Sequence, residues 1–332
     1  MAIKTNFQPR GDIQVLLGSG AKALGTKHSG SDTYHKLQVV DYNIEYASSV
    51  VEVAPSRSGI YAQMEKQGHH RPDNQMYEVT LTMRGTPTAV LKSCLSLFSE
   101  GSSAASLTGA SSTGSMKDNV SNTDAVTLVF QNAGSDTEES TPNDDIVMAG
   151  CFATQMVMRE DVGTNGGELV VETTFVTAYQ PAEEALGTIS TPTTDEAAAK
   201  NIFDLSTVQL DSQDIVLNNF EITIARPLAR VHHQGSGAAF KPFGYVQTGP
   251  YEVTGTLTVK RDDAIHDIKD HIKGDSAGIA LSIAESSGFT ISCPDVMIDN
   301  SKPEVSDFLL QSIPFRAFGA TESASVISIT IA

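Results

Sequence analysis

The sequence contains no tryptophan, only three cysteines and few charged residues, which occupy 19% of its 332 positions. Three widely spaced cysteines provide neither a disulfide framework nor the paired spacing of a zinc site. No apolar run approaches the roughly 20 residues that a membrane-spanning helix requires. The first residues lack the apolar core of a signal peptide, so we expect a protein that is made and assembled in the cytoplasm.

Positive charge is scarce, with 22 lysines and arginines against 40 aspartates and glutamates and a formal net charge of −18. Proteins that grip nucleic acid neutralise phosphates with lysine and arginine, and peripheral membrane proteins present a basic face to anionic lipid. The charge balance therefore argues against nucleic-acid binding and against a membrane partner.

The residues that are abundant are typical of strands and turns. Glycine occurs 26 times and proline 13 times, and threonine, serine and valine are frequent. These residues favour short strands joined by turns, whereas helical proteins carry more glutamate, lysine and leucine. The length suits two cores of ordinary size. The composition therefore predicts a mainly β protein of two domains.

Two segments share four consecutive residues and a period of two. Residues 77–80 read Tyr-Glu-Val-Thr, and residues 251–254 read the same. Apolar and polar residues alternate through both segments, which predicts strands with one buried face over 77–85 and 251–261.

Each shared strand lies in the same order of predicted elements: strand, strand, short amphipathic helix and three further strands. Thr86 with Pro87 forms a helix-start signal in the first copy, and Asp262 does so in the second. The predicted strands are 42–46, 77–85, 125–130, 146–151 and 172–179, and then 220–224, 251–261, 278–283, 289–293 and 311–318. This order predicts a tandem duplication; the alternative is two unrelated β domains.

The predicted duplication divides the chain into four parts. These are an N-terminal arm over 1–36, a first domain over 37–180, a linker over 181–205 and a second domain over 206–332. The first domain is longer because it contains two polar insertions, 99–122 and 131–145, whose composition cannot support a core.

The glycine-rich segment 18–27 is the nearest approach to a phosphate-binding loop. Its order, Gly25-Thr26-Lys27, reverses the Gly-Lys-Ser/Thr that such a loop requires. We therefore interpret the segment as part of the N-terminal arm.

Histidines at metal-like spacing occur in loops and on one helix. They are the pairs His69–His70 and His232–His233, and the helical group His266, Asp267, Asp270 and His271. Adjacent loop residues point apart, and the helical group shares the solvent face with no third ligand cluster. We interpret all of them as surface residues. No nucleophile elbow, zincin motif or Cys/His nucleophile setting is present. The sequence therefore predicts no catalytic, cofactor-binding or metal-binding residue, no cofactor and no enzyme activity.

The order of elements resembles the tail tube fold of long-tailed bacteriophages. In that fold a first strand leads into a long polar arm, an alternating return strand, a short helix and strands that close on an aromatic-rich segment. The second copy matches best, with strand 218–224, arm 235–250 and return strand 251–259. The resemblance covers most of 206–332 and, more loosely, 37–180. It implies two tandem tail-tube-like β-sandwich or barrel domains, each with one short helix.

In that family, subunits form six-fold rings that stack into a tube around the passing genome. A chain with two copies resembles the tubes in which three subunits form a pseudo-six-fold ring. The resemblance thus implies a structural virion protein of the phage tail that self-assembles into trimeric rings and contacts the tape measure, tail terminator and distal tail proteins. Phage DNA would pass through the lumen without specific binding. The alternative is a virion decoration or a receptor- or glycan-binding β protein.

Two further hypotheses concern how such a tube works. The polar arms 56–74 and 232–250 are long and follow the first strand of each copy, so we expect them to make ring-to-ring contacts. An acidic wall would repel DNA phosphates and keep the genome sliding.

Overall fold

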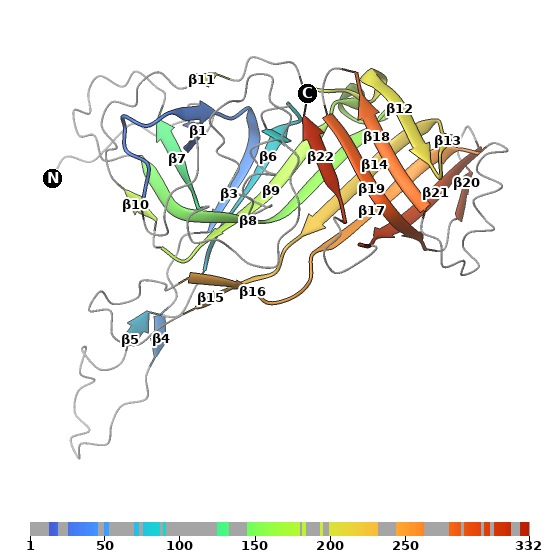
Figure 1. Cartoon of the computed structure of the whole chain (residues 1–332). Helices are drawn as coiled ribbons and strands as arrows, with labels where there is room; N and C mark the ends of the chain where they lie inside the picture. The colour runs from blue at the N-terminus through green and yellow to red at the C-terminus, as the bar shows by residue number, and fades with distance from the viewer. Residues whose placement is uncertain are drawn as a thin grey trace, which may run out of the picture.

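The computed structural model describes residues 13–18, 26–45, 50–52, 70–72, 76–86, 89–90, 125–132, 145–179, 181–183, 193–194, 199–231, 244–261, 279–286, 289–299, 302–305, 309–319 and 326–331. Over these residues the protein is mainly β, as predicted (Figure 1). Helical conformation within them is limited to residues 89–90 and two 3₁₀ turns, Asn165–Gly167 and Ile202–Asp204.

Within the described residues, the first half of the chain supplies eleven strands. They are β1 (Ile13–Gly18), β2 (Tyr34–Lys36), β3 (Val39–Glu45), β4 (Val50–Glu52), β5 (His70–Pro72), β6 (Tyr77–Arg84), β7 (Val126–Asn132), β8 (Ile146–Asp161), β9 (Val170–Thr177), β10 (Ala182–Glu183) and β11 (Thr193–Thr194). The strands predicted from alternation in this half are confirmed. β8, however, is much longer than the predicted 146–151.

The second half supplies the other eleven strands. They are β12 (Leu205–Leu210), β13 (Gln213–Asp214), β14 (Leu217–Ala225), β15 (Leu228–Val231), β16 (Gly244–Gln247), β17 (Glu252–Lys260), β18 (Ile279–Glu285), β19 (Phe289–Ile298), β20 (Lys302–Val305), β21 (Leu309–Ala317) and β22 (Ser328–Ile331). The strands predicted from alternation are confirmed here too.

The two halves pair their strands in the same order. In the first half the order across the sheet is β1–β7–β8–β9–β6–β3, and in the second it is β12–β18–β19–β21–β17–β14. The short strands follow the same order. β2 pairs with β1 as β13 pairs with β12, and β10 pairs with β8 as β22 pairs with β19. Hairpin β4–β5 lies between β3 and β6 in the chain, and hairpin β15–β16 lies between β14 and β17.

The β-bulges recur at matching places, which fixes the correspondence residue by residue. The β3–β6 ladder shifts between Val39 and Asp41, and the β14–β17 ladder shifts between Leu217 and Asn219. Val39 therefore corresponds to Leu217. The β7–β8 and β18–β19 ladders also share a shift, after Val126 and after Ile279.

This correspondence shows that the shared Tyr-Glu-Val-Thr segments do not occupy equivalent positions. Thr80 of β6 and Thr256 of β17 lie opposite equivalent positions of β3 and β14. Tyr77, three residues before Thr80, therefore corresponds to Val253, three residues before Thr256. The two segments are thus displaced by two residues. A displacement of two keeps every side chain on its face, so the alternation was still interpreted correctly.

Residues 1–36 do not form an arm over their described part. Val15, Leu16 and Leu17 of β1 are buried, and β1 pairs with β7 and β2. A three-residue apolar run, Val15–Leu17, directly before a glycine was the signal for this strand. The described end of the predicted linker is also ordered, since Leu169 N–H donates to Lys200 O (2.8 Å) and Lys200 N–H donates to Gly85 O (3.0 Å).

The first predicted helix begins where expected. Thr86 Oγ1 accepts a hydrogen bond from Ala89 N–H (3.0 Å), which is the expected cap. The second predicted helix, 263–273 with Asp262 as its cap, and insertion 99–122 lie outside the described residues, as does most of insertion 131–145.

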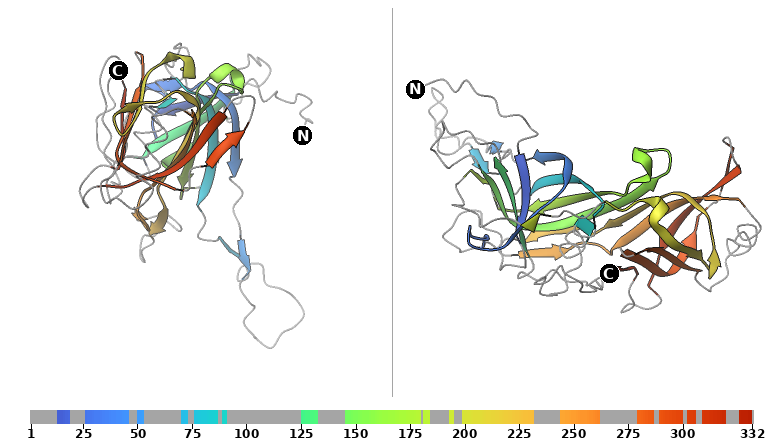
Figure 2. Two further views of the ribbon diagram at one scale, coloured as in Figure 1. Left: turned by 90° about the vertical axis from the view of Figure 1, so that its right-hand side faces the viewer. Right: turned by 90° about the horizontal axis from the view of Figure 1, so that it is seen from above.

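The long strand β8 joins the two halves into one sheet. Its first part pairs with β7 and β10, and its second part pairs with β9 on one side and β14 on the other. Figures 1 and 2 show the two halves side by side, with the curved β8 running between them. One hydrophobic core runs through both halves, from Val15 and Phe175 to Phe315 and Ile329.

Candidate assembly surface

The polar groups singled out in the sequence do not form a site in the described part of the chain. His69, His232, His233 and the helical group His266–His271 lie outside it, and of His70 only the backbone is described, in β5. Within the described ranges, no three His, Cys, Asp or Glu side chains are placed to hold a metal ion. No described helix is long and apolar enough to cross a membrane.

Two of the three cysteines are described, and both are buried and free. Burial raises the pKa of Cys151 and of Cys293 to about 12. Both therefore stay protonated thiols near neutral pH and act as small apolar core residues.

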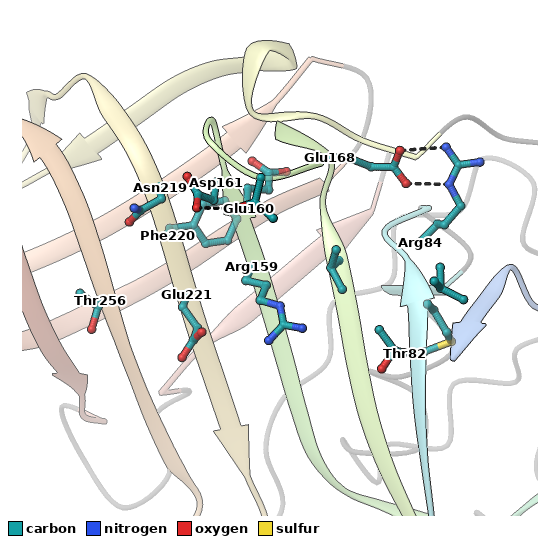
Figure 3. A pocket seen from close by; sticks show the side chains of 14 residues that line it. Thr82, Arg84, Arg159, Glu160, Asp161, Glu168, Asn219, Phe220, Glu221 and Thr256 are labelled. Carbon is teal, nitrogen blue, oxygen red and sulfur yellow. Dashed lines mark hydrogen bonds and ion pairs between the residues drawn. The ribbon is translucent and has the colours of Figure 1, made fainter. Parts of the chain in front are cut away.

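The solvent-facing side of the sheet holds a cavity of about 900 Å³ over β6, β9, β8, β14 and β17 (Figure 3). Its charged lining consists of two arginines and four acidic residues: Arg84, Arg159, Glu160, Asp161, Glu168 and Glu221. Arg84 makes a bidentate ion pair with Glu168 (Nε–Oε1 2.6 Å, Nη2–Oε2 2.9 Å), which raises the pKa of the arginine and lowers that of the glutamate. Arg159 lies 3.7 Å from Glu172 and is cross-strand from Glu221.

Both apolar and polar groups line the cavity, and apolar surface is in the majority. Each of its two arginines has a carboxylate neighbour, Glu168 beside Arg84 and Glu172 beside Arg159. The cavity therefore lies on a sheet face that combines apolar surface with ion pairs.

The antiparallel joint between β8 and β14 is the most informative feature of the sheet. Asn219 faces Asp161, Ile222 faces Met158 and Ala225 faces Gln155. The ladder continues past both strand ends, because Arg226 N–H donates to Thr154 O (2.6 Å) and Val162 N–H donates to Asn218 O (3.2 Å). The joint links the second part of β8, in the first half of the chain, to β14 in the second half.

A buried carboxyl lies at this joint. Glu160 is 1% exposed, and neither of its carboxylate oxygens has a hydrogen-bond partner among the described residues. Desolvation above all, together with the nearby carboxylates of Glu285 and Asp204, raises its pKa to about 8. Glu285 itself is paired with Lys200 (Oε1–Nζ 3.1 Å). Glu160 is therefore largely protonated at neutral pH.

The counterparts of the two joined strands are edges. β3 corresponds to β14. β19 followed by β20 corresponds to β8, because Lys302 lies opposite Ser312 where Val157 lies opposite Glu172 in the first half. Over the described residues, β3 pairs only with β6, and β20 pairs only with β21. Figure 1 places β20 at the right-hand end of the molecule and β3 in the left half.

Comparison with known proteins adds no family. No protein-family model matches the chain, and no curated protein matches it. Function is therefore inferred from the geometry of the joint and its two unpaired counterparts. Single-sequence reasoning missed this surface because strand partners far apart in the chain leave no local signal.

Proposed function

We propose that this protein is a structural, self-assembling virion protein, the tail tube protein of a long-tailed bacteriophage. Copies join head to tail into rings, and the rings stack into a tube through which DNA passes. The observation that carries the proposal is that, within the described residues, the two halves are joined once, through β8 and β14, while the corresponding strands β20 and β3 each pair with a single neighbouring strand. Such a contact is heterologous, and it generates a closed ring or a filament.

The internal joint predicts the register of the contact between copies. If β20 of one copy pairs with β3 of the next as β8 pairs with β14, Lys302 lies opposite Glu45, by analogy with Val157 opposite Thr223. Pro303 then lies opposite Ile44. The first pair brings together residues of opposite charge, which favours this register over its neighbours.

Side-chain burial on the two equivalent strands supports the same contact. Phe220 and Ile222 of β14 are fully buried beneath the joint. Their counterparts on β3, Tyr42 and Ile44, are only partly buried, although both pack against the core. A neighbouring strand would complete their burial, at about 25 cal/mol per Å² of apolar surface removed from water.

The free edges carry features that limit uncontrolled pairing. Tyr42 N–H donates to the carboxylate of the adjacent Asp41 (2.9 Å). Pro303 has no N–H, so the contact would lack one donor that Met158 supplies inside the chain. Prolines and charges on an edge strand are common protection against indiscriminate strand addition. They are compatible with a contact that forms only in the correct register.

The solvent-facing side of the sheet is the side that we propose faces the channel. The arginines of the cavity over it lie beside Glu168 and Glu172. Paired guanidinium groups offer little net attraction to phosphate, so DNA would slide past without a specific site. The resemblance to the tail tube fold implies that three copies, with six repeats, complete each ring.

The proposal is tested by electron microscopy and mass photometry of the purified protein over a range of concentrations. We expect annular trimers and stacked tubes. Monomers at every concentration would overturn the proposal, and they would favour the alternative of a decoration or glycan-binding protein.

The register is tested by exchanging charges at the predicted pair. Glu45→Lys and Lys302→Glu should each weaken ring formation, and the double variant should restore it at least partly. Glu252→Lys on β17, whose exposed side chain is not at this contact, is the control and should assemble normally. Loss of assembly in both single variants without any rescue in the double variant would refute the register.

A further inference from the structure

An exposed apolar pair lies on the outer face of the second half. Met297 of β19 is 56% exposed, and Phe318, directly after β21, is 39% exposed. Met297 lies opposite Arg316, and Phe318 N–H donates to Asp295 O (2.8 Å). The two apolar side chains are therefore diagonal neighbours on one face of the sheet, within reach of a common partner.

The counterpart of this pair in the first half is covered. Phe152 and Ala178 occupy the positions of Met297 and Phe318, and both are buried. Tyr245 of the β15–β16 hairpin covers them, with its ring 4.9 Å from the Phe152 ring at 61°. The Tyr245 hydroxyl accepts a hydrogen bond from Ala178 N–H (2.6 Å) and donates to Gly150 O (3.3 Å).

The covering hairpin follows from the joint. β15 continues directly from β14, and β14 lies beside β8, so the hairpin extends over the face of β8 that carries Phe152. Leu228, at the start of β15, packs against the same cluster. A repeat is therefore capped by the hairpin of the repeat that pairs with it.

In the part of the chain that the structure describes, strands β4 and β5 of the equivalent hairpin of the first half pair only with each other. β4–β5 extends β3 and β6 as β15–β16 extends β14 and β17. Figures 1 and 2 show it standing away from the rest of the described strands. Val50, at the start of β4, takes the place of Leu228 in the order of the repeat, so the apolar residue type is kept.

We propose that Met297 and Phe318 form the docking site for the β4–β5 hairpin of a second copy of this chain. This inference rests on the proposed head-to-tail contact, because pairing β20 with β3 carries the hairpin over β19 and β21 of the neighbour. It assigns the first arm to contacts between neighbours within a ring. The sequence had suggested ring-to-ring contacts for this arm.

The docking contact differs chemically from its internal counterpart. In the first half the Tyr245 hydroxyl lies between Ala178 N–H and Gly150 O. In the second half the corresponding groups, Phe318 N–H and Asp295 O, bond directly. No hydroxyl is needed there, and the contact is apolar, with the larger Phe318 in place of Ala178.

Photocrosslinking between copies tests the contact. A benzoylphenylalanine placed at position 297 is irradiated in assemblies mixed from ¹⁴N- and ¹⁵N-labelled chains, and crosslinked peptides are identified by mass spectrometry. We expect mixed-isotope crosslinks from position 297 to residues 46–76 of another copy. The same group at position 216, where Val216 is 58% exposed, is the control and should not crosslink to that segment.

A charge variant provides a second measurement. Met297→Glu should raise the concentration needed for assembly about tenfold or more and leave the melting temperature of the monomer unchanged, because the position is exposed. Val216→Glu should leave assembly unchanged. Rings that form with normal affinity from Met297→Glu, or crosslinks that reach only other segments, overturn the docking site and leave the proposed function standing. Monomers with no crosslinks between copies overturn both.

Discussion

Removing the buried carboxyl of Glu160 should stabilise the protein increasingly as the pH rises. The folded state holds this carboxyl protonated, because its pKa is raised from 4.5 to about 8. The unfolded chain releases the proton near its ordinary pKa. Between those two pKa values the folded state binds more protons than the unfolded state, so the stability of the native protein falls with rising pH. Glu160→Gln removes this dependence.

The pKa shift sets the largest gain in the free energy of unfolding that Glu160→Gln can produce. A shift of about 3.5 units (8 − 4.5) corresponds to about 4–5 kcal/mol at ~1.4 kcal/mol per unit. The glutamine amide is also buried without a partner, which costs about 1–3 kcal/mol. We therefore expect Glu160→Gln to be about 1–3 kcal/mol less stable than wild type at pH 4.5 and about 1–4 kcal/mol more stable at pH 9.

Urea unfolding at intervals between pH 4.5 and 9, below the concentration at which copies assemble, measures the effect. The control is Glu221→Gln at an exposed position of the adjacent strand β14, whose difference from wild type should not grow with pH. A difference between Glu160→Gln and wild type that is constant from pH 4.5 to 9 would refute the reasoning. Glu160→Met tests the same point without a buried amide.

Two further substitutions test the packing. Tyr245→Phe should lower the free energy of unfolding by about 1–3 kcal/mol, because the buried Ala178 N–H and Gly150 O lose the hydroxyl between them. Chemical denaturation measures this loss, with Tyr42→Phe at the partly exposed edge as the comparison, and an equal effect of the two substitutions would contradict this account. Gly255→Ala should lower the free energy of unfolding by about 1–3 kcal/mol, because the new Cβ would lie 2.5 Å from Phe315 Cζ and 2.6 Å from Glu221 O. Calorimetry measures the melting temperature of this variant, and an unchanged value would show that the Phe315 ring moves freely aside.

Much of the β structure could be predicted from alternation. Val79, Leu81 and Met83 alternate with polar residues, and all three are buried. The pattern failed where the alternation is irregular. β8 continues to Asp161 through a bulge between Ala153 and Gln155, which shifts the side-chain phase and hides the strand from a period-two search.

The candidate assembly surface could not be predicted in the same way. Glu160 is an ordinary surface residue type, and nothing near it in sequence shows that Glu285 and Asp204 approach it. Met297 and Phe152 are not recognisable as counterparts by residue type. Their equivalence depends on ladders formed by residues far apart in the chain.

The sequence by itself determined that the protein is mainly β, which strands exist and which face of each is buried, because these depend on local alternation and composition. Only the tertiary structure decided the registers, the entry of β1 into the sheet and the displacement of the shared Tyr-Glu-Val-Thr segments. It also decided that β8 pairs with β14 while, over the described residues, β3 pairs only with β6 and β20 only with β21. Strand pairing is made by non-local backbone hydrogen bonds, and these leave little trace in either strand's own residues.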